Sequence, residues 1–153
     1  MKFTTAFREG AEDYDEAFTF ELNGLTGRCG VGMGVEVDGH PVAFDVWLSE
    51  GDADPVVTFL LTDYALNNED ILTVLGGSGE VMRLSEGQIV RLRTDSLRLE
   101  ATVDSIDYGS QMRSIAIRRT FLDALLRRPE PDLTLNPTDY ITALRTTLRV
   151  SPA

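Results

Sequence analysis

The stretch CGVGMGVEVDGHPVAFDVWL, residues 29–48, decides the fold, because it is compatible with two opposed structures. A phosphate-binding loop places its glycines between a strand and a helix, so that backbone N–H groups point at the anion. No helical pattern follows the glycines here. Instead, apolar residues alternate with glycines and acids, which is the period of a half-buried strand. The stretch therefore predicts a strand, a two-residue turn at Asp38-Gly39 and a returning strand.

The glycines of this hairpin fall on one face, since Gly30, Gly32 and Gly34 occupy alternate positions. The returning strand places Trp47 on the face opposite the core. The apolar residues of its core face are Val42, Phe44, Val46 and Leu48. The glycine row predicts a flat groove in which another backbone or an aromatic side chain can approach closely. We expect the three glycines and Trp47 to lie in a contact between subunits.

Further strands flank the hairpin. Residues 16–22 alternate, residues 55–62 are apolar on both faces like a central strand, and residues 80–118 contain four more strands between turn-forming residues. A helix-like segment between the last two ranges is capped at Asn68 and ends at Gly76-Gly77. This spacing predicts a mainly β (α+β) fold, a small antiparallel β barrel or sandwich of about eight strands with one or two short helices and terminal arms.

The same pattern divides the chain into a core with an arm at each end. Residues 1–16 are an acidic N-terminal arm, and residues 17–128 are a single β-rich core domain that closes with a short helix over 120–128. Residues 129–153 are a proline-containing linker and a C-terminal arm or helix that begins near Asn136 and Pro137. The apolar side of that helix would need a partner, so we expect a subunit contact at Ile141, Leu144 and Leu148.

Composition limits the classes of function. The 153 residues include 25 acidic and 14 basic side chains, and a net charge of −11 disfavours binding to DNA or anionic lipid. The same acidity also fits an organism with a salt-rich cytoplasm or a GC-rich genome, in which case it says nothing about function. We expect no membrane span, because no apolar run approaches about 18 residues. We expect no signal peptide either, because after Lys2 the charged residues Arg8 and Glu9 follow too soon for an apolar signal-peptide core. The chain has a single cysteine, which cannot build a multi-cysteine metal site and argues against redox chemistry.

Few residues offer chemistry. His40 is the only histidine, and Cys29 stands at the other end of the same strand, roughly 35 Å away if the strand is straight, which argues against a dyad. Glu50, Asp52 and Asp54 offer oxygens to a hard cation, but they lack the spacing of an EF-hand loop and fit a solvated acidic turn better. We expect no cofactor and no metal.

One local basic cluster brackets the short helix. It consists of Arg118, Arg119, Arg127 and Arg128. In a chain this acidic we expect these arginines to pair with carboxylates of this or a neighbouring subunit rather than with phosphate. None of the candidates supplies a catalytic constellation, so the sequence predicts a protein that is not an enzyme.

Residues 79–119 carry a longer pattern: a leucine, a gap, a glycine with an acid or amide, two strands, a turn and a closing strand that ends in arginine. The matching positions are Leu84, Gly87, Gln88, Val90, Leu92, Val103, Ile106, Gly109, Ile115, Ile117 and Arg118. This pattern resembles the C-terminal β core of head-tail connector proteins of tailed viruses. Family members usually have an acid where Gln88 stands, and the crossover over residues 93–101 is heavier than usual.

The resemblance implies a small structural subunit of the virion, assembled in the host cytoplasm. Such a subunit forms a homo-oligomeric ring at the head-tail neck or upper tail, and contacts portal, connector or tail proteins through loops and arms. It implies no specific nucleic-acid binding and no membrane. DNA would pass through an acidic lumen that repels it.

Residues 40–128 support an alternative. They have a proline and an alanine before a strand, an aromatic residue in the next strand, and a Gly-x-Gly-acid-Val motif at Gly77, Gly79, Glu80 and Val81. This is similar to the SsgA-like sporulation and cell-division proteins of actinobacteria. The similarity implies an intracellular adaptor with a whirly-like fold. Phe59 replaces the family's usual tryptophan, and residues 63–66 replace its Arg-Asp-Leu-Leu helix start.

Overall fold

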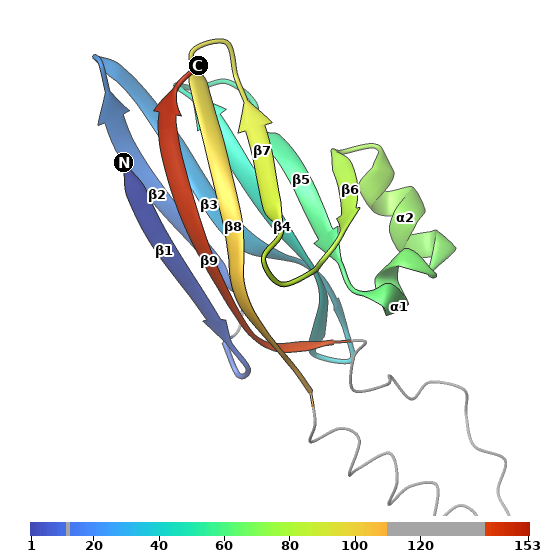
Figure 1. The fold of residues 1–153 in the computed structure, drawn as a ribbon. Coiled ribbons are helices and arrows are strands. Elements are labelled where there is room, and N and C mark those ends of the chain that lie inside the picture. The colour runs from blue at the N-terminus through green and yellow to red at the C-terminus, as the bar shows by residue number, and fades with distance from the viewer. Residues whose placement is uncertain (12, 110–139) are drawn as a thin grey trace, which may run out of the picture.

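Two β-sheets face each other in the computed structural model, which describes residues 1–11, 13–109 and 140–153 (Figure 1). One sheet has the strand order β2-β3-β4-β5-β6 and the other the order β1-β9-β8-β7. Neither sheet closes on itself, so the prediction of a mainly β, sandwich-like α+β fold is confirmed. The elements are β1 (Lys2–Arg8), β2 (Asp15–Leu22), β3 (Leu25–Val37), β4 (His40–Glu50), β5 (Val56–Leu61), α1 (Asp63–Leu66), α2 (Glu69–Gly76), β6 (Glu80–Arg83), β7 (Ile89–Arg93), β8 (Leu97–Tyr108) and β9 (Ile141–Pro152).

Two tight turns set the register of β2, β3 and β4. Asn23 and Gly24 have φ of 53° and 79°, and Asp38 and Gly39 have φ of 52° and 79°. Positive φ at both central residues is the geometry of a primed hairpin turn, whose twist matches that of the strands it joins. The hairpin predicted at Asp38-Gly39 is therefore confirmed.

The helices lie in the crossover from β5 to β6. Asn68 begins α2 by accepting a hydrogen bond from the Ile71 N–H at 3.1 Å, and α2 ends at Gly76 with Gly77 as its cap, as the sequence predicts. β6 then pairs with β5 in parallel. The sequence grouping of residues 80–83 with the later strands is therefore wrong. A crossover through two helices is long enough to return the chain to the same sheet edge, which a hairpin turn is not.

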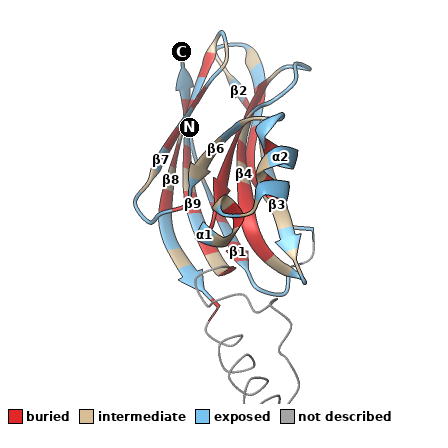
Figure 2. Cartoon of the chain, turned by 90° about the vertical axis from the view of Figure 1, so that its right-hand side faces the viewer, coloured by how far each residue is buried: buried red, intermediate tan, exposed pale blue. Residues whose placement is uncertain are grey.

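The core fills the space between the sheets. Alternate residues of each strand point inward, so buried and exposed positions alternate along β7, β8 and β9 (Figure 2). On the side where β1 and β2 lie, aromatic rings bridge the sheets, with the centroids of Phe3 and Phe18 4.6 Å apart and those of Phe7 and Phe44 5.2 Å apart. Burial of these large side chains is the main force that holds the two sheets together.

Neither end of the chain is the arm expected from sequence. Lys2–Arg8 is a strand paired with β9, and the Met1 amino group donates to the Val150 carbonyl at 3.1 Å. Residues 141–152 form a strand, β9, instead of a helix. Ile141, Leu144 and Leu148 are buried in the core of their own chain, so they are not the exposed subunit contact that we expected.

The helical interpretation fails because residues three and four apart on a helix can also belong to a strand. Leu144, Thr146, Leu148 and Val150 are all buried, whereas Arg145 and Arg149 are exposed. This is a period of two, and the β-branched threonines and valine favour a strand. The predicted strand over 112–118, the helix over 120–128, the linker with Asn136 and Pro137, and the arginines Arg118, Arg119, Arg127 and Arg128 lie outside the described residues.

Candidate functional site

The outer face of the five-stranded sheet is covered over part of its area. A second apolar cluster, separate from the core between the sheets, packs Ile71 and Leu75 of α2 and Ala65 of α1 against β4 and β5. Phe59 belongs to this cluster at the boundary of the covered area. The helices therefore cover the end of the sheet near β6 and leave the part over β2, β3 and β4 open.

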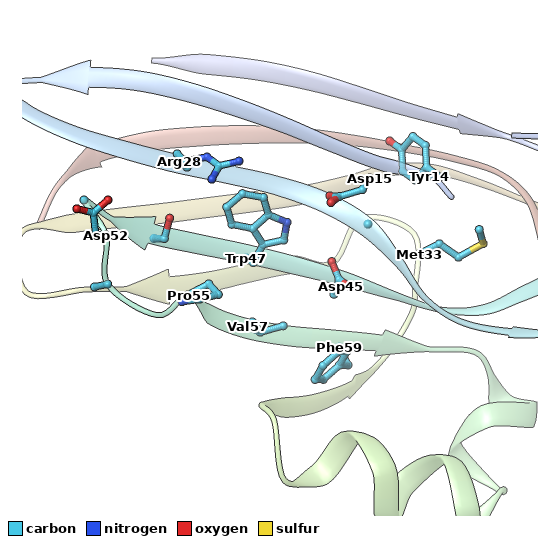
Figure 3. A pocket seen from close by; sticks show the side chains of 14 residues that line it. Tyr14, Asp15, Arg28, Met33, Asp45, Trp47, Asp52, Pro55, Val57 and Phe59 are labelled. Atoms are coloured by element: carbon cyan, nitrogen blue, oxygen red, sulfur yellow. The ribbon is translucent and has the colours of Figure 1, made fainter. Parts of the chain in front are cut away.

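A groove of about 700 Å³ occupies this open part (Figure 3). We call it the Trp47 groove. The loop between β4 and β5 forms one end of it, and β2 forms a side. Its lining residues are Tyr14, Asp15, Arg28, Gly32, Met33, Asp45, Trp47, Ser49, Gly51, Asp52, Ala53, Pro55, Val57 and Phe59. The groove combines an aromatic floor with three carboxylates and one guanidinium group.

The glycine row lies opposite the core, as predicted, and one of its members, Gly32, lines the Trp47 groove. Gly30 pairs with Trp47 across β3 and β4, and a Cβ on Gly30 would lie 2.9 Å from the indole Cζ2 and 2.5 Å from the Glu16 carbonyl oxygen. The aromatic side chain that approaches the glycines is thus the protein's own. Gly34 is less restricted, because its nearest neighbours to a Cβ, beginning with the Ala43 carbonyl oxygen, stand at 3.5 Å or more.

Gly32 lies between two aspartates. Asp15 on β2 and Asp45 on β4 are its register partners on either side. A Cβ on Gly32 would lie 2.8 Å from Asp45 Oδ1 and 3.4 Å from Asp15 Oδ1. Both carboxylates therefore lie close over Gly32, which leaves no room for a side chain at this position, and they converge on the same part of the groove.

The environment of Asp45 disfavours its charge. Burial raises the pKa of Asp45 above its ordinary value of 3.8, the negative charge of Asp15 raises it further, and a hydrogen bond from the Gly32 backbone opposes both effects. A cation placed between the two carboxylates would relieve the repulsion. The pair is therefore built to gain from a positive ligand.

Trp47 already makes a cation–π contact with one side chain of its own chain, Arg28. The Arg28 guanidinium carbon lies 5.8 Å from the centroid of the indole, within the range of a cation–π contact. Arg28 is exposed and Trp47 is half-buried. The indole thus rests on the Gly30 backbone, and the pair of Gly32 and Asp45 lies two residues further along the strands.

The three acidic residues that the sequence offers as candidate cation ligands do not gather at one site, because Glu50 and Asp54 line one hollow and Asp52 lines another. Glu50 accepts a hydrogen bond from the Ser96 N–H at 3.2 Å, and hydrogen bonds from Thr94 and Ser96 hold the pKa of Glu50 below its ordinary range. Asp52 lines the Trp47 groove, whereas Asp54 lines a different hollow beside Arg93. Across residues 1–11, 13–109 and 140–153, no group of three or more His, Cys, Asp or Glu side chains is arranged to hold a metal ion.

Cys29 and His40 have separate environments. Cys29 is fully buried in the core, and burial raises the pKa of its thiol to about 12. The His40 ring packs against Tyr140 with centroids 4.5 Å apart, and its Nδ1 lies 4.0 Å from Glu9 Oε1. These surroundings are structural for both side chains.

Sequence reasoning found the glycines and Trp47 but missed Asp15, Asp45 and Arg28. The signal that could have found them is the pair of tight turns. Counting back from Asn23-Gly24 pairs Asp15 with Gly32, and counting back from Asp38-Gly39 pairs Gly32 with Asp45. The carboxylate pair follows from two turns together and from neither alone.

No helix within the described residues is long and apolar enough to cross a membrane. Comparison of the chain with protein-family models, with curated proteins and with solved structures finds no match.

Proposed function

We propose that the chain is a non-enzymatic structural component of a tailed-virus particle that forms a ring at the head-tail neck or upper tail. The resemblance of residues 79–119 to head-tail connector proteins motivates this proposal. The observation that carries it is the presence of open sheet edges on opposite sides of the sandwich. β1 and β2 lie along one side, and β6 and β7 lie along the other (Figure 1). A closed ring needs two different surfaces on opposite sides of each subunit.

The backbone of β2 is oriented for pairing with another strand. The Met33 N–H donates to the Tyr14 carbonyl, so even-numbered residues of β2 bond to β3. The N–H and C=O groups of Asp15, Ala17, Thr19 and Glu21 therefore point away from the sheet. In the part of the chain that the structure describes, no strand pairs with this edge. Such an edge can accept a strand of a neighbouring subunit.

The edge of β7 has the same property and a different charge. The Thr94 N–H donates to the Leu97 carbonyl, which turns the backbone groups of Ile89, Arg91 and Arg93 outward. Arg91 and Arg93 are exposed, whereas β2 carries exposed Asp15 and Glu21. A basic side that meets an acidic side favours head-to-tail association over association through identical surfaces.

The first experiment measures the solution mass by light scattering across salt concentrations, alone and with the products of neighbouring genes. Negative-stain electron microscopy then looks for rings. We expect ring-sized or partner-dependent mass that decreases as salt screens the contact between the charged edges. A chain that stays monomeric at every salt concentration and with every neighbouring product would contradict the proposal.

Thr19→Pro tests the edge itself. The Thr19 N–H points outward, so proline removes no hydrogen bond within the sheet, but it blocks a strand from pairing there. We expect Thr19→Pro to fold and to lose the ring, and Thr19→Ala to keep it. If Thr19→Pro assembles like the native chain, the edge of β2 is not the contact between subunits.

The alternative is an SsgA-like adaptor in cell division or sporulation. Its support is that the motifs within residues 40–128 that carry the resemblance to that family fall in one continuous unit of β4, β5, α1, α2 and β6. An adaptor would be a small stable oligomer at all salt concentrations, without rings. The same mass measurement therefore discriminates between the two functions.

A further inference from the structure

The Trp47 groove contains two carboxylates that converge over a glycine. Asp15, Gly32 and Asp45 stand side by side on three neighbouring strands, and both carboxylates reach toward the place where a Cβ of Gly32 would be. Strand pairing holds all three residues, so the carboxylate pair is part of the sheet and not of a loop. The site therefore exists before any ligand binds.

The charges of the groove are not balanced from within. Asp15, Asp45 and Asp52 face a single guanidinium, that of Arg28, which lies over Trp47. Among the described residues, the salt bridges join other pairs and none involves these aspartates. The groove thus has an excess of negative charge, and part of that charge is shielded from water.

A pair of carboxylates on either side of Gly32 favours a planar cation. A guanidinium group presents several N–H donors in one plane and can bond to two carboxylates at once, whereas an ammonium group acts as a point charge. Guanidinium groups also stack on indole rings, and Arg28 already makes this kind of contact with Trp47.

The rest of the groove fits a polypeptide. From the paired aspartates it continues past Trp47 to Pro55 and the loop between β4 and β5, along an apolar floor (Figure 3). A second copy of this chain is a poor source of a basic segment, because acidic side chains outnumber basic ones 25 to 14 along it. A segment of a different, basic protein has the complementary charge.

We propose that the Trp47 groove binds an arginine side chain presented by an extended segment of a partner protein, with the guanidinium between Asp15 and Asp45 and beside Trp47. The site shares Asp15 with the β2 edge proposed to build the ring, whereas Asp45 and Trp47 lie on β4, away from that edge. It remains testable in a chain that does not assemble.

Trp47 is the only tryptophan of the chain, so its fluorescence reports directly on the groove. The probe is a capped peptide, acetyl-Gly-Ser-Arg-Ser-Gly-amide, titrated at low salt. Matched peptides carry lysine or citrulline, the uncharged isostere of arginine, at the central position. We expect the arginine peptide to change the Trp47 emission saturably, to bind at least about fivefold more tightly than the lysine peptide and at least about tenfold more tightly than the citrulline peptide.

Two variants remove the proposed contacts without changing the size of the side chain. Asp45→Asn and Asp15→Asn should each weaken binding of the arginine peptide by about tenfold, whereas Asp54→Asn, which lies outside the groove, should leave it unchanged. Thermal melting of each variant establishes that it is folded. Asp15 is exposed, so Asp15→Asn keeps the test decisive if Asp45→Asn does not fold.

Several results would overturn the proposal. Equal binding of the arginine and citrulline peptides would exclude a charge contact, and equal binding of the lysine peptide would exclude a site for guanidinium. Native binding in both aspartate variants would place the peptide elsewhere. A change of Trp47 emission with the concentration of the Thr19→Pro variant alone, which should not form the ring, would show that a second copy occupies the groove. None of these results bears on the ring, which the mass measurement tests separately.

Discussion

The indole of Trp47 lies against the backbone of Gly30, its partner across β3 and β4. A Cβ at Gly30 would meet both the indole and the Glu16 carbonyl oxygen, at 2.9 Å and 2.5 Å, so only glycine leaves room for the ring. This contact fixes the orientation of the aromatic floor of the groove. It also explains why the glycine row lies opposite the core without a phosphate or a neighbouring chain to require it.

Gly30→Ala and Gly34→Ala form a matched pair. The first forces a methyl group into Trp47 and the backbone of β2, and we expect it to lower the free energy of unfolding by about 1–3 kcal/mol. The second meets only ordinary contacts and should change it by less than about 1 kcal/mol. Urea unfolding measures both. Equal effects would mean that Trp47 does not rest on Gly30.

Asp45→Asn tests the desolvated carboxylate through pH. The pKa of Asp45 is raised in the folded state, so the native chain loses stability as pH rises from 3.8, the ordinary value, through the folded pKa. Asparagine removes this loss. We expect the variant to be more stable than the native chain at pH 7 and to lose that advantage near pH 3, as followed by urea unfolding. A stability difference independent of pH would contradict the assignment.

Cys29 should resist thiol reagents while the chain is folded. With its pKa raised to about 12, the thiolate fraction at pH 8 is lower on the order of a thousandfold than at the ordinary value of 9.0, and burial restricts access further. Reaction with a chromogenic disulfide reagent should be slow in buffer and complete within minutes in urea. Fast reaction in buffer would mean that the core opens readily.

Thr62 connects α1 to the sheet. Its hydroxyl donates to the Val42 carbonyl at 3.1 Å and accepts from the Ala65 N–H at 3.4 Å, and the residue is buried. We expect Thr62→Ala to cost about 1–2 kcal/mol of unfolding free energy, whereas Thr62→Ser, which keeps the hydroxyl, should retain most of it. Chemical denaturation compares the two. Similar losses would assign the effect to the methyl group instead.

Leu148 and Arg149 test the last strand. Leu148 is fully buried in the core and Arg149 is exposed, as neighbours on a strand must be. Leu148→Ala should lower the unfolding free energy by about 2–5 kcal/mol, and Arg149→Ala by less than about 0.5 kcal/mol. Both are measured by thermal and urea unfolding. A small effect at Leu148 would support the exposed helix expected from sequence.

The sequence correctly predicted the parts of the fold that depend only on residues close to one another in the chain. Asp38-Gly39 adopts the turn that its composition requires, and Asn68 begins a helix with its own side chain. Strands with clear alternation, such as those on either side of that turn, are found where expected. The sequence was sufficient wherever neighbouring residues alone decide the backbone conformation.

The errors occur where distant segments decide. Lys2–Arg8 was expected to belong to an N-terminal arm, but it is a strand that pairs with β9, which is distant in the sequence. The spacing of Ile141, Leu144 and Leu148 fits one face of a helix. In the structure Thr146 and Val150 are buried as well, and this period of two is that of a strand. In the candidate site, Trp47 was visible from sequence, whereas Asp15 and Asp45 come together only through strand pairing. The proximity of the two aspartates depends on the register of β2 with β3 and of β3 with β4, which no single segment determines.

The place of β9 between β1 and β8 has a consequence for how the protein is made. β1 leaves the ribosome early, but its partner is more distant in sequence than that of any other described strand, with Lys2 opposite Arg149. Until β9 emerges, β1 and β8 have no strand between them. The four-stranded sheet therefore cannot form gradually during synthesis. A nascent chain stalled before residue 141 would offer two long edges to other chains, and would need a chaperone or a fast return to translation to avoid aggregation.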